Sequence, residues 1–159
     1  MLILDTCSWL KIKLLDESNT VSLKQLIYAN DPYATHQLIT ELKYYLKDYI
    51  DYTKLSIQAI EIDKYKAYSE KKLDDADLSI IGLGRMNPRA FVISDDHPEL
   101  EALNAFNVRC GRLSEYLLFL VKVDLLKKND ANRAIKKLRQ VKNIKEKDKD
   151  RLLQKINIA

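Results

Sequence analysis

The sequence has few of the residues that interrupt regular structure, and few cysteines. Only three glycines and three prolines occur among its 159 residues, which argues against a collagen-like or disordered chain. The two cysteines, Cys7 and Cys110, form no CxxC pair, so we expect two buried thiols in a reducing compartment rather than a disulfide framework. With 47% hydrophobic residues, the chain can build the core of one domain.

Long apolar runs are also missing. The most apolar stretch, residues 116–121, is followed by Lys122 and Asp124 and is far too short to span a bilayer. The start has no basic segment ahead of a long apolar stretch, so we expect no signal peptide. These absences predict a cytoplasmic protein with no membrane partner.

Charge is distributed unevenly along the chain. Residues 127–159 contain twelve Lys or Arg and four acidic residues, which leaves residues 1–126 with 15 of the 27 basic and 19 of the 23 acidic residues. We therefore divide the chain into a main domain, residues 1–126, and a basic helical extension, residues 127–159. The extension favours an anionic partner such as nucleic acid, with Lys136, Lys137 and Arg139 as candidate contacts. A solvated helical face is the alternative interpretation.

Short apolar segments alternate with segments of helical periodicity. Strands are expected at 2–4, 33–36, 90–94 and 108–110, and residues 55–62 read as a short strand or a loop. Helices are expected at 6–15, 23–30, 37–49, 63–71, 74–86, 98–106, 114–126, 131–141 and about 146–156. This alternation predicts a three-layer α/β/α fold with a central, mostly parallel sheet and extra C-terminal helices.

Acidic residues follow two of the predicted strands. Asp5 ends the strand LILD, and Asp95 and Asp96 follow the strand AFVIS. Because open parallel sheets bind ligands at the carboxyl ends of their strands, we expect these carboxylates to lie near one another. A helix N-cap is the alternative role of Asp5.

Two acidic residues inside predicted helices can join this pair. Glu41 lies at the border of an apolar helix face, and Asp77 lies three residues after Asp74 in a capping-box position. Several carboxylates in one cleft raise each other's pKa unless cations offset their charge. Ligands that are all oxygen favour Mg²⁺ or Mn²⁺.

Four blocks, LILDTCSWL, ATHQLITELK, LDDADLSIIGLGR and AFVISDDHPEL, resemble the PIN-domain nucleases in their order and spacing. The resemblance covers about residues 1–113. It implies a hydrolase that cleaves RNA phosphodiester bonds with Mg²⁺ or Mn²⁺. It also implies that Asp5, Glu41, Asp77 and Asp96 are the catalytic and metal-binding residues, with Ser94 and Asp95 supporting them. One departure is that Gly82 and Gly84 stand where the family often has Ala.

The resemblance also suggests partners. Stand-alone PIN proteins similar to VapC are frequently the toxins of toxin–antitoxin pairs, so it implies RNA, an antitoxin protein and a second copy of the chain as partners. A non-catalytic PIN-like RNA-binding or scaffold protein is one alternative, and an RNA-processing nuclease outside toxin–antitoxin systems is another. A haloacid-dehalogenase phosphohydrolase is disfavoured because it needs an Asp two residues after Asp5, where this chain has Cys7.

A few further residues are candidates for binding RNA. Arg85 and Arg89 follow the acidic helix and could contact phosphates, and Tyr44 is expected at the surface, where it could stack on a base. By contrast, Tyr45 and Tyr49 share a helix face with leucines and are expected in the core.

Overall fold

The computed structural model contains a five-stranded sheet in the order β3-β2-β1-β4-β5. It describes residues 1–71, 73–141 and 146–159, without the side chains of residues 68–71, 146 and 147. All the strand pairs are parallel, so the predicted parallel sheet is confirmed. Its strands are β1 (Leu2–Leu4), β2 (Pro32–Thr35), β3 (Ser56–Gln58), β4 (Phe91–Ile93) and β5 (Cys110–Gly111).

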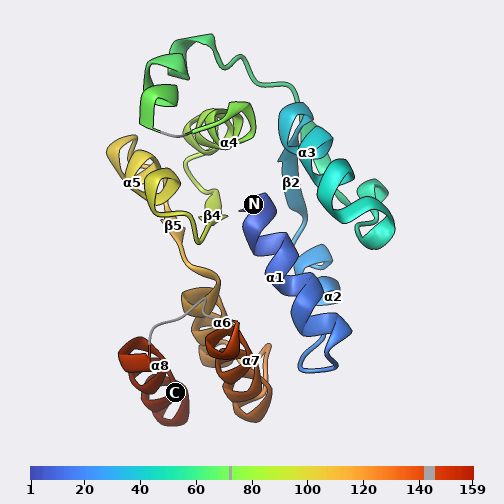
Figure 1. Cartoon of the computed structure of the whole chain (residues 1–159), viewed down its shortest axis with the longest axis vertical. Helices are drawn as coiled ribbons and strands as arrows, with labels where there is room; N and C mark the ends of the chain where they lie inside the picture. The colour runs from blue at the N-terminus through green and yellow to red at the C-terminus, as the bar shows by residue number, and fades with distance from the viewer. Residues whose placement is uncertain (72, 142–145) are drawn as a thin grey trace.

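Helices cover both faces of this sheet, which confirms the predicted three-layer fold. The helices α1 (Thr6–Glu17), α2 (Lys24–Tyr28) and α3 (His36–Leu46) lie on one side of the row of strands, and α4 (Asp75–Met86) and α5 (His97–Ala105) lie on the other (Figure 1). The chain runs from β1 through β2 to β3 in one direction and then returns past β1 to β4 and β5. Right-handed crossovers in opposite directions place their helices on opposite faces.

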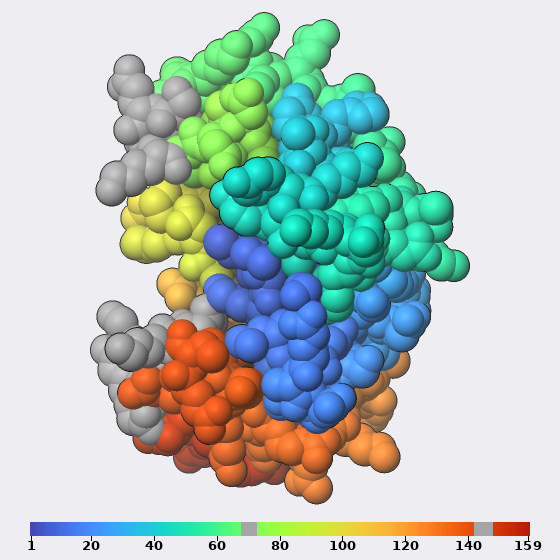
Figure 2. Space-filling view, turned by 45° about the vertical axis from the view of Figure 1, so that its right-hand side comes forward, coloured from blue at the N-terminus to red at the C-terminus, as the bar shows by residue number. Residues whose placement is uncertain are grey.

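The remaining helices follow the sheet. They are α6 (Leu113–Lys122), α7 (Lys128–Gln140) and α8 (Glu146–Ile158), and α7 packs against α1, α6 and α8. Figure 2 shows α7 (orange) beside α1 (blue) on the surface. The predicted extension includes Lys142 and Lys145, which lie outside the described residues. The helix α7 buries an apolar face made of Ala131, Ala134, Ile135 and Leu138.

The central strands are buried and the edge strand β3 is not. Every residue of β1 is buried, whereas Ser56 and Ile57 of β3 are exposed. This exposure explains why residues 55–62 lack a clear strand pattern. Three short 3₁₀ helices flank this region: η1 (Lys47–Tyr49), η2 (Tyr52–Lys54) and η3 (Asp63–Lys71). In the part of the chain that is described, no helix is long and apolar enough to cross a membrane.

Candidate metal-binding active site

The carboxyl ends of β1 and β4 meet at the point where the chain changes direction across the sheet. β1 pairs with β2 on one side and with β4 on the other. Asp5 follows β1 directly, and its N–H donates to the carbonyl of Ile93 at the end of β4 over 3.1 Å. In open parallel sheets, ligands bind in the crevice at such a point.

A small pocket of about 170 Å³ opens at this edge of the sheet. Its walls come from segments that are far apart in the sequence, namely the starts of α1, α4 and α5 and the middle of α3. The apolar part of the lining includes Leu38 and Ile80. The acidic part consists of Asp5, Glu41, Asp74, Asp77 and Asp96. All four acids implied by the resemblance therefore line one pocket, which we call the acidic pocket.

Asp5 is buried and held at both carboxylate oxygens. It is the N-cap of α1, where Oδ1 accepts from the Ser8 N–H over 2.6 Å, and Oδ2 accepts from the Ser94 hydroxyl over 2.8 Å. Burial raises the pKa of Asp5, and these hydrogen bonds offset only part of that effect. Asp5 therefore both caps a helix and lines the acidic pocket.

Asp77 forms the capping box of α4 with Asp74. The Asp77 N–H donates to Asp74 Oδ1 over 3.0 Å, and the Asp74 N–H donates to Asp77 Oδ2 over 3.1 Å. Burial and the charge of Asp74 raise the pKa of Asp77 to about 7. The pKa of Glu41, which is half-buried on α3, is also raised by burial and by Asp74. Without a cation, these carboxyl groups hold their protons more tightly than usual.

The loop after β4 is held by its own polar contacts. The Ser94 hydroxyl accepts from the Asp96 N–H over 3.0 Å, and Asp96 Oδ2 accepts from the Glu99 N–H over 3.1 Å as the N-cap of α5. Ser94 thus connects Asp5 with the backbone of Asp96. Asp95 instead forms a 2.7 Å ion pair with Lys11, which ties this loop to α1.

The expectation that both cysteines are buried is wrong. Cys7 is exposed and Cys110 is half-buried, because α1 buries Thr6, Ser8 and Trp9 and turns Cys7 toward the rim of the acidic pocket. Partial burial and the charge of Asp5 raise the pKa of Cys7 to about 11. The thiol therefore stays protonated at neutral pH and is a poor nucleophile.

Glu99 is a carboxylate that the sequence did not single out. It lies on α5 and is fully buried. Burial raises its pKa well above the ordinary value, and the charges of Asp5 and Asp77 raise it further. Its spacing of three and four residues from Ala102 and Leu103, both buried, is the signal in the sequence that places it on the inner face of the helix.

The donor set fits a divalent cation in its chemistry. In the described residues, no group of three or more His, Cys, Asp or Glu side chains is already arranged to hold a metal ion. Asp5, Asp77 and Asp96 are engaged with backbone N–H groups at helix starts. The five acidic side chains of the pocket nevertheless offer carboxylate oxygens, the ligands that Mg²⁺ and Mn²⁺ prefer. A bound cation would also offset the repulsion between these carboxylates.

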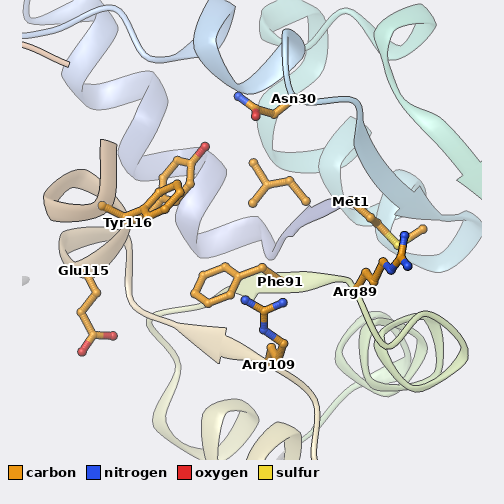
Figure 3. A pocket seen from close by; sticks show the side chains of 9 residues that line it. Met1, Asn30, Arg89, Phe91, Arg109, Glu115 and Tyr116 are labelled. Carbon is orange, nitrogen blue, oxygen red and sulfur yellow. The ribbon is translucent and has the colours of Figure 1, made fainter. Parts of the chain in front are cut away.

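The predicted basic contacts lie elsewhere. Arg89 lines a separate pocket of about 280 Å³ together with Arg109, Phe91 and Tyr116 (Figure 3). This second pocket includes Met1 and Leu2 and so lies at the opposite, amino-terminal edge of the sheet. Arg85 lies over the ring of Phe106, 5.1 Å from its centroid, at the far end of α4 from Asp77. Lys136, Lys137 and Arg139 lie on α7, at the lower end of Figure 1, whereas α4 lies toward the upper end.

An open groove adjoins the acidic pocket and shares Glu41 and Asp74 with it. Its other walls include Tyr44 and Tyr45, which are 76% and 56% exposed. The expectation that Tyr45 is in the core is therefore wrong, because α3 buries Leu38, Ile39, Leu42 and Leu46 and leaves Tyr45 outside that face. The two rings meet edge to face, with centroids 4.8 Å apart.

Comparison with protein-family models, curated proteins and solved structures found no match for this chain. Membership of the PIN-domain nucleases therefore remains a proposal. The residues that support it are the acids of the pocket and the serine that connects two of them.

Proposed function

We propose that this protein is a divalent-cation-dependent endoribonuclease of the PIN type. The observation that carries the proposal is that Asp5, Glu41, Asp77 and Asp96, from four different elements, line one pocket at the carboxyl edge of a parallel sheet. The crevice at that edge is where such sheets bind ligands. Oxygen-rich cation sites of this kind commonly bind the phosphate groups of substrates.

Asp5, Asp77, Asp96 and Glu41 would hold the cation. When bound, a divalent cation lowers the pKa of a water molecule and offsets negative charge on a phosphodiester. Ser94 fixes the orientation of Asp5 through its 2.8 Å hydrogen bond. Asp95 and Lys11 hold the loop after β4 against α1, which keeps Asp96 at the pocket. Chemistry through a cysteine nucleophile is disfavoured because the pKa of Cys7 is raised to about 11.

The groove beside the acidic pocket supports an RNA strand as the substrate. Tyr44 and Tyr45 expose aromatic rings there, and aromatic rings bind unpaired bases by stacking without strong sequence preference. A base next to the scissile phosphate would then lie over the tyrosines while the phosphate enters the acidic pocket. This arrangement favours single-stranded RNA over a duplex, whose bases are already stacked.

A cleavage assay tests the proposal. Chelator-treated protein should not cut an end-labelled single-stranded RNA, and added Mg²⁺ or Mn²⁺ should restore cutting. Asp5→Asn keeps the shape of the side chain and removes its charge, so we expect a loss of activity on the order of 100-fold. Asp124→Asn is the matched control, because Asp124 is an exposed aspartate just after α6 that lines neither the acidic pocket nor the groove beside it.

Two results would overturn the proposal. One is undiminished cleavage by Asp5→Asn, which would leave Asp5 with its capping role only. The other is cleavage that persists at full rate in excess chelator.

A further inference from the structure

One row of the sheet forms a wall of the second pocket, which has a volume of about 280 Å³. Leu2 of β1 is in register with Phe91 of β4. The parallel pairing of Val92 with Cys110 places Arg109, the residue before β5, next to Phe91 on its other side. Side chains in register on parallel strands share one face of a sheet, so an arginine stands in a row with two apolar side chains.

Aromatic rings of α6 form another wall of the second pocket. Tyr116 and Phe119 both line it, and their rings are stacked with centroids 6.1 Å apart. Tyr116 is buried, whereas Phe119 is 52% exposed. Together with the ring of Phe91, they offer apolar surfaces on which a flat ring system can pack.

Two arginines line the second pocket without a partner. Within the described part of the chain, neither Arg89 nor Arg109 forms an ion pair or lies over an aromatic ring. Glu115, the acid that the described lining contains, accepts from the Arg112 N–H over 2.9 Å at the start of α6. Figure 3 shows its carboxylate turned away from the pocket. Two guanidinium groups therefore remain available beside the apolar walls.

The lining indicates the class of ligand. A single guanidinium can bind both oxygens of a carboxylate, whereas a phosphate monoester has three acceptor oxygens and up to two charges, which suits two arginines from different segments. Asn30 and Tyr116 lie across the pocket from Arg109 (Figure 3) and provide an amide and a hydroxyl, which can form hydrogen bonds with a base. Small-molecule sites usually have volumes of about 300–1,000 Å³, so this pocket suits one ring system with one anionic group.

We propose that the second pocket binds a nucleoside monophosphate, with its base against the rings of Phe91, Tyr116 and Phe119 and its phosphate at Arg89 and Arg109. The pocket lies at the amino-terminal edge of the sheet, opposite the acidic pocket. The ligand is therefore separate from the RNA of the proposed function, and the two proposals can fail independently.

Titration calorimetry of chelator-treated protein with AMP, GMP, CMP and UMP tests the inference. Without a cation, the carboxylates of the acidic pocket repel a phosphate, so binding there does not interfere. We expect at least one monophosphate to bind with a Kd below about 1 mM. The corresponding nucleoside and inorganic phosphate should each bind at least about tenfold more weakly, because each lacks one half of the contacts.

Substitutions of exposed side chains locate the binding site without disturbing the core. Arg89→Gln and Arg109→Gln each remove a charged donor and should weaken binding of that monophosphate about tenfold or more. Phe119→Ala removes a stacking surface and should weaken it about fivefold or more. Arg133→Gln is the matched control, because Arg133 is an exposed arginine of α7 that pairs with Asp130 and lies outside the lining of this pocket. Its affinity should equal that of the wild type.

The inference fails on any of three results. The first is that none of the four monophosphates binds with a Kd below about 1 mM. The second is binding that both arginine substitutions leave unchanged, which would place the ligand elsewhere on the protein. The third is benzoate that binds as tightly as the best monophosphate, because the pocket would then select an aromatic carboxylate.

Discussion

At the scale of single residues, three acids of the pocket cap helices with the same carboxylate oxygens that we propose bind the cation. Asp5, Asp77 and Asp96 accept hydrogen bonds from backbone N–H groups at the starts of α1, α4 and α5. These contacts stabilise helix termini and hold the carboxylates at the pocket. Burial raises the pKa of Asp5 and of Asp77, so these two carboxyl groups resist full ionisation in the absence of a cation.

The pH dependence of stability follows from Asp77. Its pKa is about 7 in the folded metal-free protein and 3.8 ordinarily, so the folded state holds this proton more tightly than the unfolded state. The stability contributed by Asp77 is therefore fully present below about pH 4 and is lost as the pH rises through about 7. Asp77→Asn keeps an oxygen that can accept from the Asp74 N–H and cannot ionise.

We expect metal-free Asp77→Asn to be more stable than the wild type by about 1–3 kcal/mol near pH 8, after allowance for solvent screening. Near pH 4 the two proteins should be equally stable. Urea denaturation in chelator at both pH values measures the difference. A difference that does not change with pH would contradict this assignment of the proton to Asp77.

At the scale of elements, α4 owes its position to two glycines that also depart from the family pattern. A Cβ atom added at Gly82 would lie 2.5 Å from Cγ2 of Ile60, and one added at Gly84 would lie 2.5 Å from Cγ1 of Val108. Both distances are shorter than any real carbon contact. The glycines therefore allow α4, with Asp77 at its start, to approach its neighbours closely.

Gly84→Ala tests this close packing. Alanine favours a helix over glycine by about 1 kcal/mol, but the overlap with Val108 should outweigh that gain. We expect the free energy of unfolding to fall by about 1–3 kcal/mol. Chemical denaturation of Gly84→Ala, Val108→Ala and the double variant measures the coupling. The double variant should lose less than the sum of the single losses, and a Gly84→Ala protein as stable as the wild type would refute the close contact.

Local patterns predicted the elements better than they predicted the directions of side chains. The capping box of Asp74 and Asp77 could be predicted because both partners lie within one helical turn. The burial of Glu99 was missed because a glutamate three residues after an N-cap is ordinarily expected to accept from the N-cap N–H, and in the folded chain the N–H of Asp96 donates to Ser94 instead. Tyr45 was misplaced for a similar reason, since only the packing of α3 decides which side of the helix stays open.

At the scale of the whole molecule, the order of the strands gathers residues that are distant in the sequence. Asp5 and Asp96 are 91 positions apart, yet the parallel pairing of β1 with β4 brings the ends of their strands together. This convergence could be predicted from alternating strands and helices, because all carboxyl ends of a parallel sheet lie at one edge. No comparable rule predicts where the basic side chains lie, and Arg89 lies at the amino-terminal edge of the sheet, opposite the acidic pocket.

The acidic pocket and the candidate basic residues lie in different parts of the molecule. The acidic pocket lies among α1, α3, α4 and α5, whereas the candidate basic residues of α7 lie beyond α1 (Figure 1). Among the described residues, the lining of the acidic pocket includes no lysine or arginine. A cation is therefore the most direct means of binding a phosphate there.

The most direct measurement of the central claim is an anomalous difference map from crystals of the wild-type protein soaked in Mn²⁺. We predict a peak inside the acidic pocket, within coordinating distance of the carboxylate of Asp5 and of at least one of Asp77 and Asp96. The same soak of Asp5→Asn crystals should give a weaker peak or none. A pocket without a peak in wild-type crystals at saturating Mn²⁺, or manganese bound only at other surfaces, would contradict the account.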